Sequence, residues 1–222
     1  MTARIPFPTL ALLAMALGFA PVAAQETPRS RAQGVLPAEV FAQVDAAARA
    51  AEAEGIPGEI LFNKALEGAA KGAPPERLVP AVTAYAGRLR EARTAFGADA
   101  GAPLLVAGAD ALQRGVGAGL LQGLGRSEER SPMACLVLAD LVEMGLGDDH
   151  ALSLVREALR VRAREQQMLD MPAQVRRLMS QGRSAQDAVE QVRRGLQRGR
   201  GGGVTPPVAP GSEPTRPRRG GG

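Results

Sequence analysis

The sequence predicts an all-α fold of antiparallel helical hairpins, placed between a polar leader and a basic tail. Apolar residues recur every three or four positions in segment after segment, which is the period of an amphipathic helix and not of a strand. Most of these segments end at a glycine and begin near Pro, Ser or Asp, as helices do. Residues 198–222 are mostly Gly, Pro and Arg, which cannot bury enough apolar surface to fold, so we expect a disordered tail.

Residues 1–24 have the pattern of a secretory signal peptide. Arg4 supplies a positive start, and the apolar run from Leu10 to Ala20 is too short to span a bilayer. Small residues then precede an expected cleavage site between Ala24 and Gln25. We therefore expect an exported protein of a bacterial cell envelope, either periplasmic or secreted. No later segment is long and apolar enough to cross a membrane, so no transmembrane segment is expected in the mature chain.

The first half of the mature chain predicts a leader and then three helices. Residues 25–35 are polar and without a pattern, so we expect a disordered leader there and place the helical domain at residues 36–197. The apolar stripes that follow have a helical period. They predict helices at residues 37–55, 58–72 and 74–96.

The stretch SPMACLVLADLVEMGLGDDHALSLVREALRV predicts the clearest hairpin. Ser131 is expected to cap its first helix, and Pro132 suits the first helical position. Gly145 is expected to end this helix in a left-handed conformation, and Asp148 or Asp149 to cap the second helix. The buried face of the first helix is expected to contain Cys135, Leu136, Val137, Leu138, Leu141 and Val142.

Weaker patterns flank this hairpin. Pro103 opens a weak helix before a glycine-rich break, and residues 120–124 are expected to form a single turn or a short helix. After the hairpin, we interpret residues 170–172 (Asp-Met-Pro) as a boundary between helices. Ser184 and Asp187 have the spacing of a capping box for the last helix.

Three segments, KGAPPERLVPAV, MGLGDDHALSLV and QGRSAQDAVEQV, align on one another without gaps. Each has glycine second and valine last, and the break at Gly115 falls about midway between the first two. This pattern indicates helix–Gly–helix units of about the length of known helical repeats. The signatures of tetratricopeptide and ankyrin repeats are absent, so the sequence leaves an irregular helical repeat and a plain helical bundle open.

The formal net charge is +4, and the basic charge is concentrated in residues 195–222, which hold five arginines and one glutamate. A second arginine feature lies in the predicted hairpin, where three arginines spaced four residues apart form a like-charged row on one helix face. Because arginine attracts anionic groups, these side chains are the candidate anion- or partner-binding residues. They are Arg156, Arg160 and Arg164 in the row, and Arg198, Arg200, Arg216, Arg218 and Arg219 in the tail.

Residue types that catalysis and metal binding need are scarce, so no catalytic or metal-ligating residue and no cofactor is predicted. His150 is the only histidine, and together with Asp148 and Asp149 it falls short of the four ligands of a structural zinc site. Cys135 is the only cysteine, which excludes an internal disulfide, and its apolar helix predicts burial. The aromatic residues of the mature chain lie on apolar helical positions, which leaves none to stack on nucleic-acid bases.

These observations predict an exported, non-catalytic helical protein that binds another envelope protein or a peptide through a helical groove, as an interaction or scaffold module. In an alternative hypothesis, the protein attaches to anionic polymer or lipid at the envelope surface through its arginine-rich tail. A third hypothesis is a helical enzyme that uses His150 and Asp149, and it has less support because function has to be argued from a site.

Overall fold

The computed structural model describes residues 26–127 and 130–199, and within these ranges it contains ten helices and no strand. This confirms the all-α fold class. The helices are α1 (Pro28–Val35), α2 (Ala38–Ala53), α3 (Glu59–Ala70), α4 (Pro75–Phe96), α5 (Ala102–Gln113), α6 (Ala118–Gly125), α7 (Pro132–Glu143), α8 (Asp148–Arg160), α9 (Glu165–Ser180) and α10 (Ala185–Gly199).

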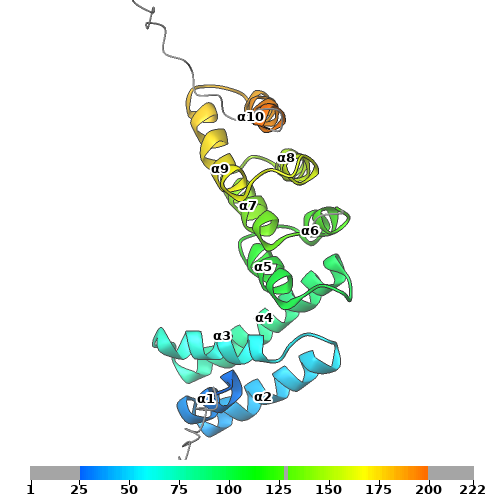
Figure 1. Cartoon of the computed structure of the whole chain (residues 1–222). Helices are drawn as coiled ribbons and strands as arrows, with labels where there is room; N and C mark the ends of the chain where they lie inside the picture. Colours follow the sequence, from blue (N-terminus) through cyan, green and yellow to red (C-terminus); the bar gives the residue numbers. More distant parts are fainter. Residues whose placement is uncertain (1–25, 128–129, 200–222) are drawn as a thin grey trace, which may run out of the picture.

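The helices stack as successive hairpins in two layers (Figure 1). In the layer of odd-numbered helices, α1 packs on α3, α5 on α7, and α7 on α9. In the layer of even-numbered helices, α2 packs on α4, and α4, α6, α8 and α10 follow in order. Each helix therefore contacts near neighbours in the stack, as in repeat proteins. Of the two arrangements that the sequence leaves open, the described residues adopt the open helical stack.

The turn after α7 shows how the hairpins are made. Gly145 has a φ of 81°, a left-handed conformation that disfavours any side chain. Its amide donates to the carbonyl of Val142, and the amide of Leu146 donates to the carbonyl of Leu141, which satisfies two carbonyls at the helix end. The same pair of hydrogen bonds and a positive φ recur after five other helices. The residues at these positions are Gly55, Gly72, Gly115, Arg162 and Gly182.

The three aligned sequence segments have equivalent places in this architecture. Their glycines, Gly72, Gly145 and Gly182, each begin the turn from an odd-numbered helix to the next even-numbered helix. Gly115 does the same between α5 and α6. The predicted helix–Gly–helix unit therefore corresponds to one hairpin of the stack.

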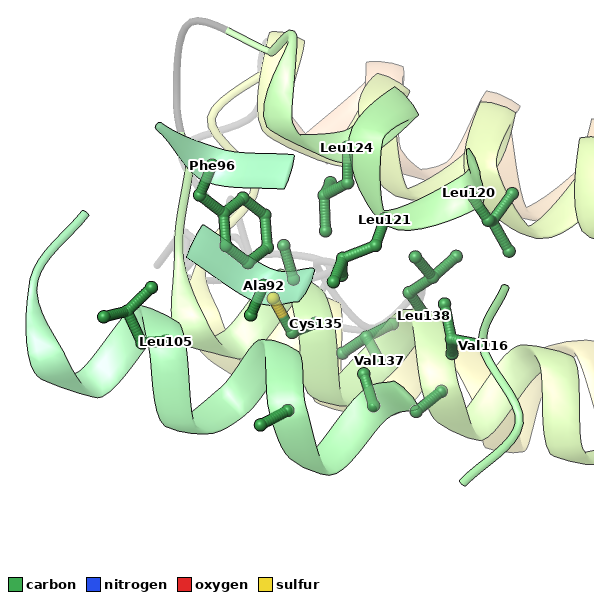
Figure 2. Close-up of a cluster of buried hydrophobic side chains, with 14 of the residues drawn as sticks. Ala92, Phe96, Leu105, Val116, Leu120, Leu121, Leu124, Cys135, Val137 and Leu138 are labelled. Carbon is green, nitrogen blue, oxygen red and sulfur yellow. The ribbon is translucent and has the colours of Figure 1, made fainter. Parts of the chain in front are cut away.

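The core lies between the two layers and is continuous along the stack. Around α4 it joins Phe96, Leu105, Leu121 and Cys135 from four different helices (Figure 2). Close approach of the helices depends on small residues, because Gly108 of α5 faces the ring of Phe96 with no space for a side chain. Tight contacts of this kind fix α5 and α6 against α4.

The N-terminal leader prediction is wrong for residues 28–35, which form α1. The side chain of Thr27 accepts a hydrogen bond from the amide of Ser30, and Arg29 pairs with Asp45 of α2 at 2.9 Å. Within the helix, only Ala32 is buried, so the segment has no apolar stripe that a pattern could reveal. Residue 25 lies outside the described residues.

Two smaller predictions about helix ends are also wrong. Pro172 does not mark a boundary, because α9 continues through it from Glu165 to Ser180, with the proline ring buried against neighbouring helices. Neither Asp148 nor Asp149 caps α8, because Gly147 holds the cap position and both aspartates lie in the first turn. There they stabilise the helix through its dipole. The predicted caps Ser131 and Ser184 are confirmed by hydrogen bonds from the amides of Ala134 and Asp187.

None of the helices within the described residues combines the length and the apolar character that crossing a bilayer requires.

Candidate binding groove

A hollow of about 570 Å³ lies on the face of the odd-numbered helices, between α5 and α7, with Lys64 of α3 at its edge. Its apolar part comes from Val106 and Ala107 of α5 and from Met133 and Leu136 of α7. We call this hollow the α5/α7 groove. It has the size of a site for a few side chains of a binding partner.

The groove exists because the odd-numbered layer is interrupted. α4 is 22 residues long, and α5 packs along it instead of packing on α3. In the odd-numbered layer of the described residues, α3 therefore does not pack on α5 or α7, whereas α1 packs on α3 and α7 on α9 (Figure 1). The groove lies on α5 and α7 beside this interruption, with Lys64 of α3 at its edge.

The two helices that form the groove are apolar on their outer sides as well as their inner sides. α5 carries one charged residue, Asp110, and α7 carries two, Asp140 and Glu143. A helix that is apolar all round is normally covered on every side. The prediction that Leu136 belongs to the buried face of α7 is wrong, because its side chain is 44% exposed and lines the groove, whereas its neighbour Val137 is fully buried.

Two further hollows lie on the same face of the stack. One, between α1 and α3, is lined by Val35 and Leu66, and the other, between α7 and α9, is lined by Leu169 and Pro172. Among the described residues, three large apolar side chains are exposed, and these are Val35, Leu136 and Leu169. Each belongs to an odd-numbered helix and each lines one of the three hollows. In the described part of the chain, the large exposed apolar side chains are therefore confined to odd-numbered helices, and this grouping favours an interaction surface there.

Charged side chains surround the apolar part of the groove. Arg114, at the end of α5, reaches α7 and donates to Asp140 at 2.5 Å and to Glu143 at 3.2 Å, which raises the pKa of the Arg114 guanidinium. On the α3 side, Lys64 pairs with Glu67 at 3.1 Å and lies 5.1 Å from the centre of the Tyr85 ring. The groove therefore joins an apolar floor to a rim with fixed charges of both signs.

Tyr85 connects this rim to the core. Burial raises the pKa of its hydroxyl, and the nearby carboxylate of Asp110 raises it further. The guanidinium carbon of Arg88 lies 5.7 Å from the centre of the Tyr85 ring, and the Arg88 side chain donates a hydrogen bond to Gln113 at 3.1 Å. The hydroxyl stays protonated at neutral pH, so Tyr85 acts as a packing and hydrogen-bonding group.

The structure separates the three arginines of the predicted row. α8 ends at Arg160, and Arg164 holds the cap position of α9 after an intervening turn, so the prediction of one like-charged helix face is wrong. Arg160 pairs with Glu157 at 2.7 Å, and Arg156 is exposed on α8. The pattern failed because helical spacing has no meaning across the left-handed turn at Arg162. Of the predicted tail residues, Arg198 lies in α10, and Arg200, Arg216, Arg218 and Arg219 lie outside the described residues.

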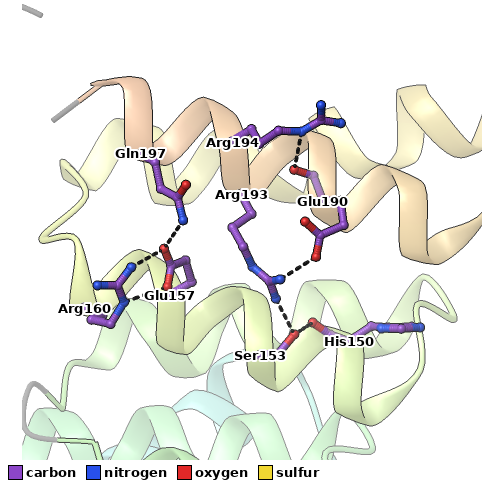
Figure 3. A network of polar contacts seen from close by, with 8 residues as sticks. All are labelled: His150, Ser153, Glu157, Arg160, Glu190, Arg193, Arg194 and Gln197. Atoms are coloured by element: carbon purple, nitrogen blue, oxygen red, sulfur yellow. Dashed lines mark hydrogen bonds and ion pairs between the residues drawn. The ribbon is translucent and has the colours of Figure 1, made fainter. Parts of the chain in front are cut away.

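A polar network joins α8 to α10 on the even-numbered side (Figure 3). Arg193 pairs with Glu190 at 2.5 Å and donates to the hydroxyl of Ser153 at 3.3 Å, and Gln197 donates to Glu157 at 2.8 Å. The hydrogen bonds from Arg160 and Gln197 lower the pKa of Glu157 to about 2. These contacts hold the last helix on the stack.

His150 is near this network, but its side chain extends away from it (Figure 3). Only its main-chain carbonyl takes part, by accepting a hydrogen bond from Ser153. Cys135 is fully buried, and burial raises the pKa of its thiol to about 12, so it is not an activated nucleophile. Among the residues that the structure describes, no three His, Cys, Asp or Glu side chains are grouped to hold a metal ion.

Comparison of the chain with protein-family models, with curated proteins and with solved structures returned no match.

Proposed function

We propose that this protein is an exported, non-catalytic scaffold of the bacterial cell envelope that binds a protein or peptide segment in the α5/α7 groove. The observation that carries the proposal is the placement of Val35, Leu136 and Leu169. These exposed apolar side chains all lie on odd-numbered helices, one in each hollow of that face. An extended partner that lies along the stack buries all three, and burial of apolar surface supplies the binding free energy.

The even-numbered face offers a useful contrast. α8 and α10 present charged and polar residues outward and bury one narrow apolar stripe each, formed in α8 by Leu154, Val155 and Leu159. Such helices are satisfied by the contacts within the chain. Binding through the odd-numbered face is therefore favoured over binding through the opposite side.

Site-specific photo-crosslinking in cells tests this proposal. A photoreactive residue placed at Leu136 or Leu169 is expected to capture the same discrete partner, because both positions lie along one surface. The same residue at Arg156, exposed on α8, serves as the matched control and is expected to capture nothing discrete. Two outcomes would show that the groove is not the binding site. One is equal capture from Arg156, and the other is undiminished capture by the probe at Leu169 in a protein that also carries Leu136→Asp.

Export is tested separately, because it is supported by the pattern of residues 1–24 and not by the groove. Mass spectrometry of the protein recovered from the cell envelope or medium is expected to identify Gln25 as the first residue. A protein that keeps Met1 or carries a lipid at its N-terminus would contradict this part of the proposal.

A further inference from the structure

The groove contains one carboxylate that the chain itself does not neutralise. Asp110 is exposed on α5 and lines the α5/α7 groove. Within the described residues, no lysine or arginine forms an ion pair with it, although its counterpart Asp140 is paired with Arg114. Asp110 and Asp140 are counterparts because each lies five residues before the turn glycine of its hairpin, Gly115 or Gly145.

The missing pair is notable because the sequence provides a cation at the right spacing. Arg114 follows Asp110 by four residues, and an acidic residue four positions before a basic one normally pairs with it on a helix. Arg114 instead extends to Asp140 and Glu143 of α7. Asp140 and Glu143 line the neighbouring hollow between α7 and α9, so Asp110 is the carboxylate that lines the α5/α7 groove, and within the described residues it has no arginine partner there.

The other charges near the groove do not supply the missing cation. Lys64, which also lines the groove, pairs with Glu67 on its own helix. Arg88 lies over the Tyr85 ring and donates to Gln113. Arg176 of α9 lines the next hollow, on the far side of Asp140 and Glu143. A cation brought by a partner therefore has a site at Asp110, next to the apolar surface of Leu136 and Met133.

We infer that the segment bound in the α5/α7 groove carries an apolar side chain close to a lysine or arginine, and that the cation pairs with Asp110. This inference rests on the proposed function and names the chemistry of its partner. The apolar side chain provides most of the affinity, and the ion pair at this partly exposed rim provides selectivity.

Selection from a random peptide library displayed on phage tests the inference, with the whole exported protein as the target. Peptides selected on the wild type are expected to combine Leu, Met or Phe with a nearby Lys or Arg. In a parallel selection on Asp110→Asn, the excess of basic residues is expected to disappear while the apolar residues remain. Asp149→Asn removes one carboxylate from α8 and is the matched control, on which the excess is expected to persist.

Individual peptides then give the magnitude. Their affinity for Asp110→Asn is expected to be about two- to fivefold weaker than for the wild type, as for exposed ion pairs. This difference is expected to vanish at about 1 M salt, where the Debye length is about 3 Å. A peptide in which Glu replaces the basic residue is expected to regain affinity on Asp110→Lys.

The outcomes separate the inference from the function on which it rests. Selected peptides that bind the wild type but not Leu136→Asp are thereby placed in the groove. If such peptides show no excess of basic residues, or bind Asp110→Asn as tightly as the wild type, the inference is overturned and the binding groove stands. If no selected peptide loses its binding on Leu136→Asp, the proposed function itself is overturned. Leu136 is exposed, so circular dichroism of Leu136→Asp is expected to match the wild type and exclude misfolding as the cause.

Discussion

Gly125 of α6 lies directly against the main-chain carbonyl oxygen of Ala95 in α4, with no room for even a methyl group between them. Because the neighbour is backbone, it cannot rotate away as a side chain would. Replacement of Gly125 by Ala is therefore expected to reduce the free energy of unfolding by about 1–3 kcal/mol, the usual cost of overpacking.

Gly119 in the same helix is the control for this substitution. A Cβ atom there meets nothing within 4 Å, so Gly119→Ala is expected to be neutral or slightly stabilising. Chemical denaturation of both variants provides the measurement. Equal stability of the two would mean that α6 does not approach α4 as the structure shows.

A second prediction compares two neighbouring leucines of α7. Leu138 is fully buried, so Leu138→Ala is expected to reduce the free energy of unfolding by about 2–5 kcal/mol. Leu136 is exposed in the groove, and Leu136→Ala is expected to change it by no more than about 0.5 kcal/mol. Urea denaturation distinguishes the two, and a reversed order would place the opposite face of α7 in the core.

Gly145 in a turn and Gly195 at an open helical position are expected to respond in opposite directions to replacement by alanine. Gly145→Ala places a methyl group on a residue with φ of 81°, which is expected to cost about 1 kcal/mol. Gly195→Ala in α10, where a Cβ atom meets nothing, is expected to stabilise by up to about 1 kcal/mol. Thermal unfolding followed by circular dichroism measures both shifts, and a shared sign would contradict the assigned turn.

Cys135 is expected to be protected from thiol reagents until the protein unfolds. Burial raises the pKa of its thiol from 9.0 to about 12, so the folded protein holds the proton where the unfolded chain releases it. Stability is therefore expected to fall as pH rises above 9, and to fall less in Cys135→Ala. Labelling by a disulfide reagent in native buffer at the rate of an exposed thiol would contradict the buried position.

Glu157 gives the opposite dependence on pH. Its pKa is lowered from 4.5 to about 2 by hydrogen bonds from Arg160 and Gln197, so the carboxylate stabilises the fold above pH 4.5. This contribution is lost as pH falls through about 2. Glu157→Gln is expected to be less stable than the wild type at neutral pH and to converge with it toward pH 2. Denaturation curves across this range test the prediction, and a constant difference at every pH would refute it.

The ends of α7 were predictable because their signals are local. Ser131 and Pro132 begin α7 as expected, and Gly145 ends it, since capping and a left-handed turn depend on a few adjacent residues. The faces of α7 were not predictable in the same way. Leu136 and Val137 are both apolar neighbours in the sequence, and only the packing of α5 and α9 decides that one is exposed and the other buried.

The charges of the groove were missed for a similar reason. The sequence places Arg114 four residues after Asp110, which favours a pair within one helix, and the structure instead joins Arg114 to α7. Asp110 and Asp140 hold matching positions before their turn glycines, but both lie outside the three aligned segments, so the alignment did not pair them. α1 was not predicted because a helix that buries a single alanine shows no periodic apolar pattern in the sequence.

An open stack has two ends, and its resistance to local opening differs along its length. Within the described residues, α4 packs on α2, α3, α5 and α6, whereas the main contacts of α10 are with α8 and α9. The α9–α10 hairpin is therefore expected to detach without disturbing the helices around α4, and its amide hydrogens are expected to exchange with solvent at a lower free energy than those of α4. The α5/α7 groove lies beside the well-held part, so its shape is expected to persist through openings that release the C-terminal hairpin.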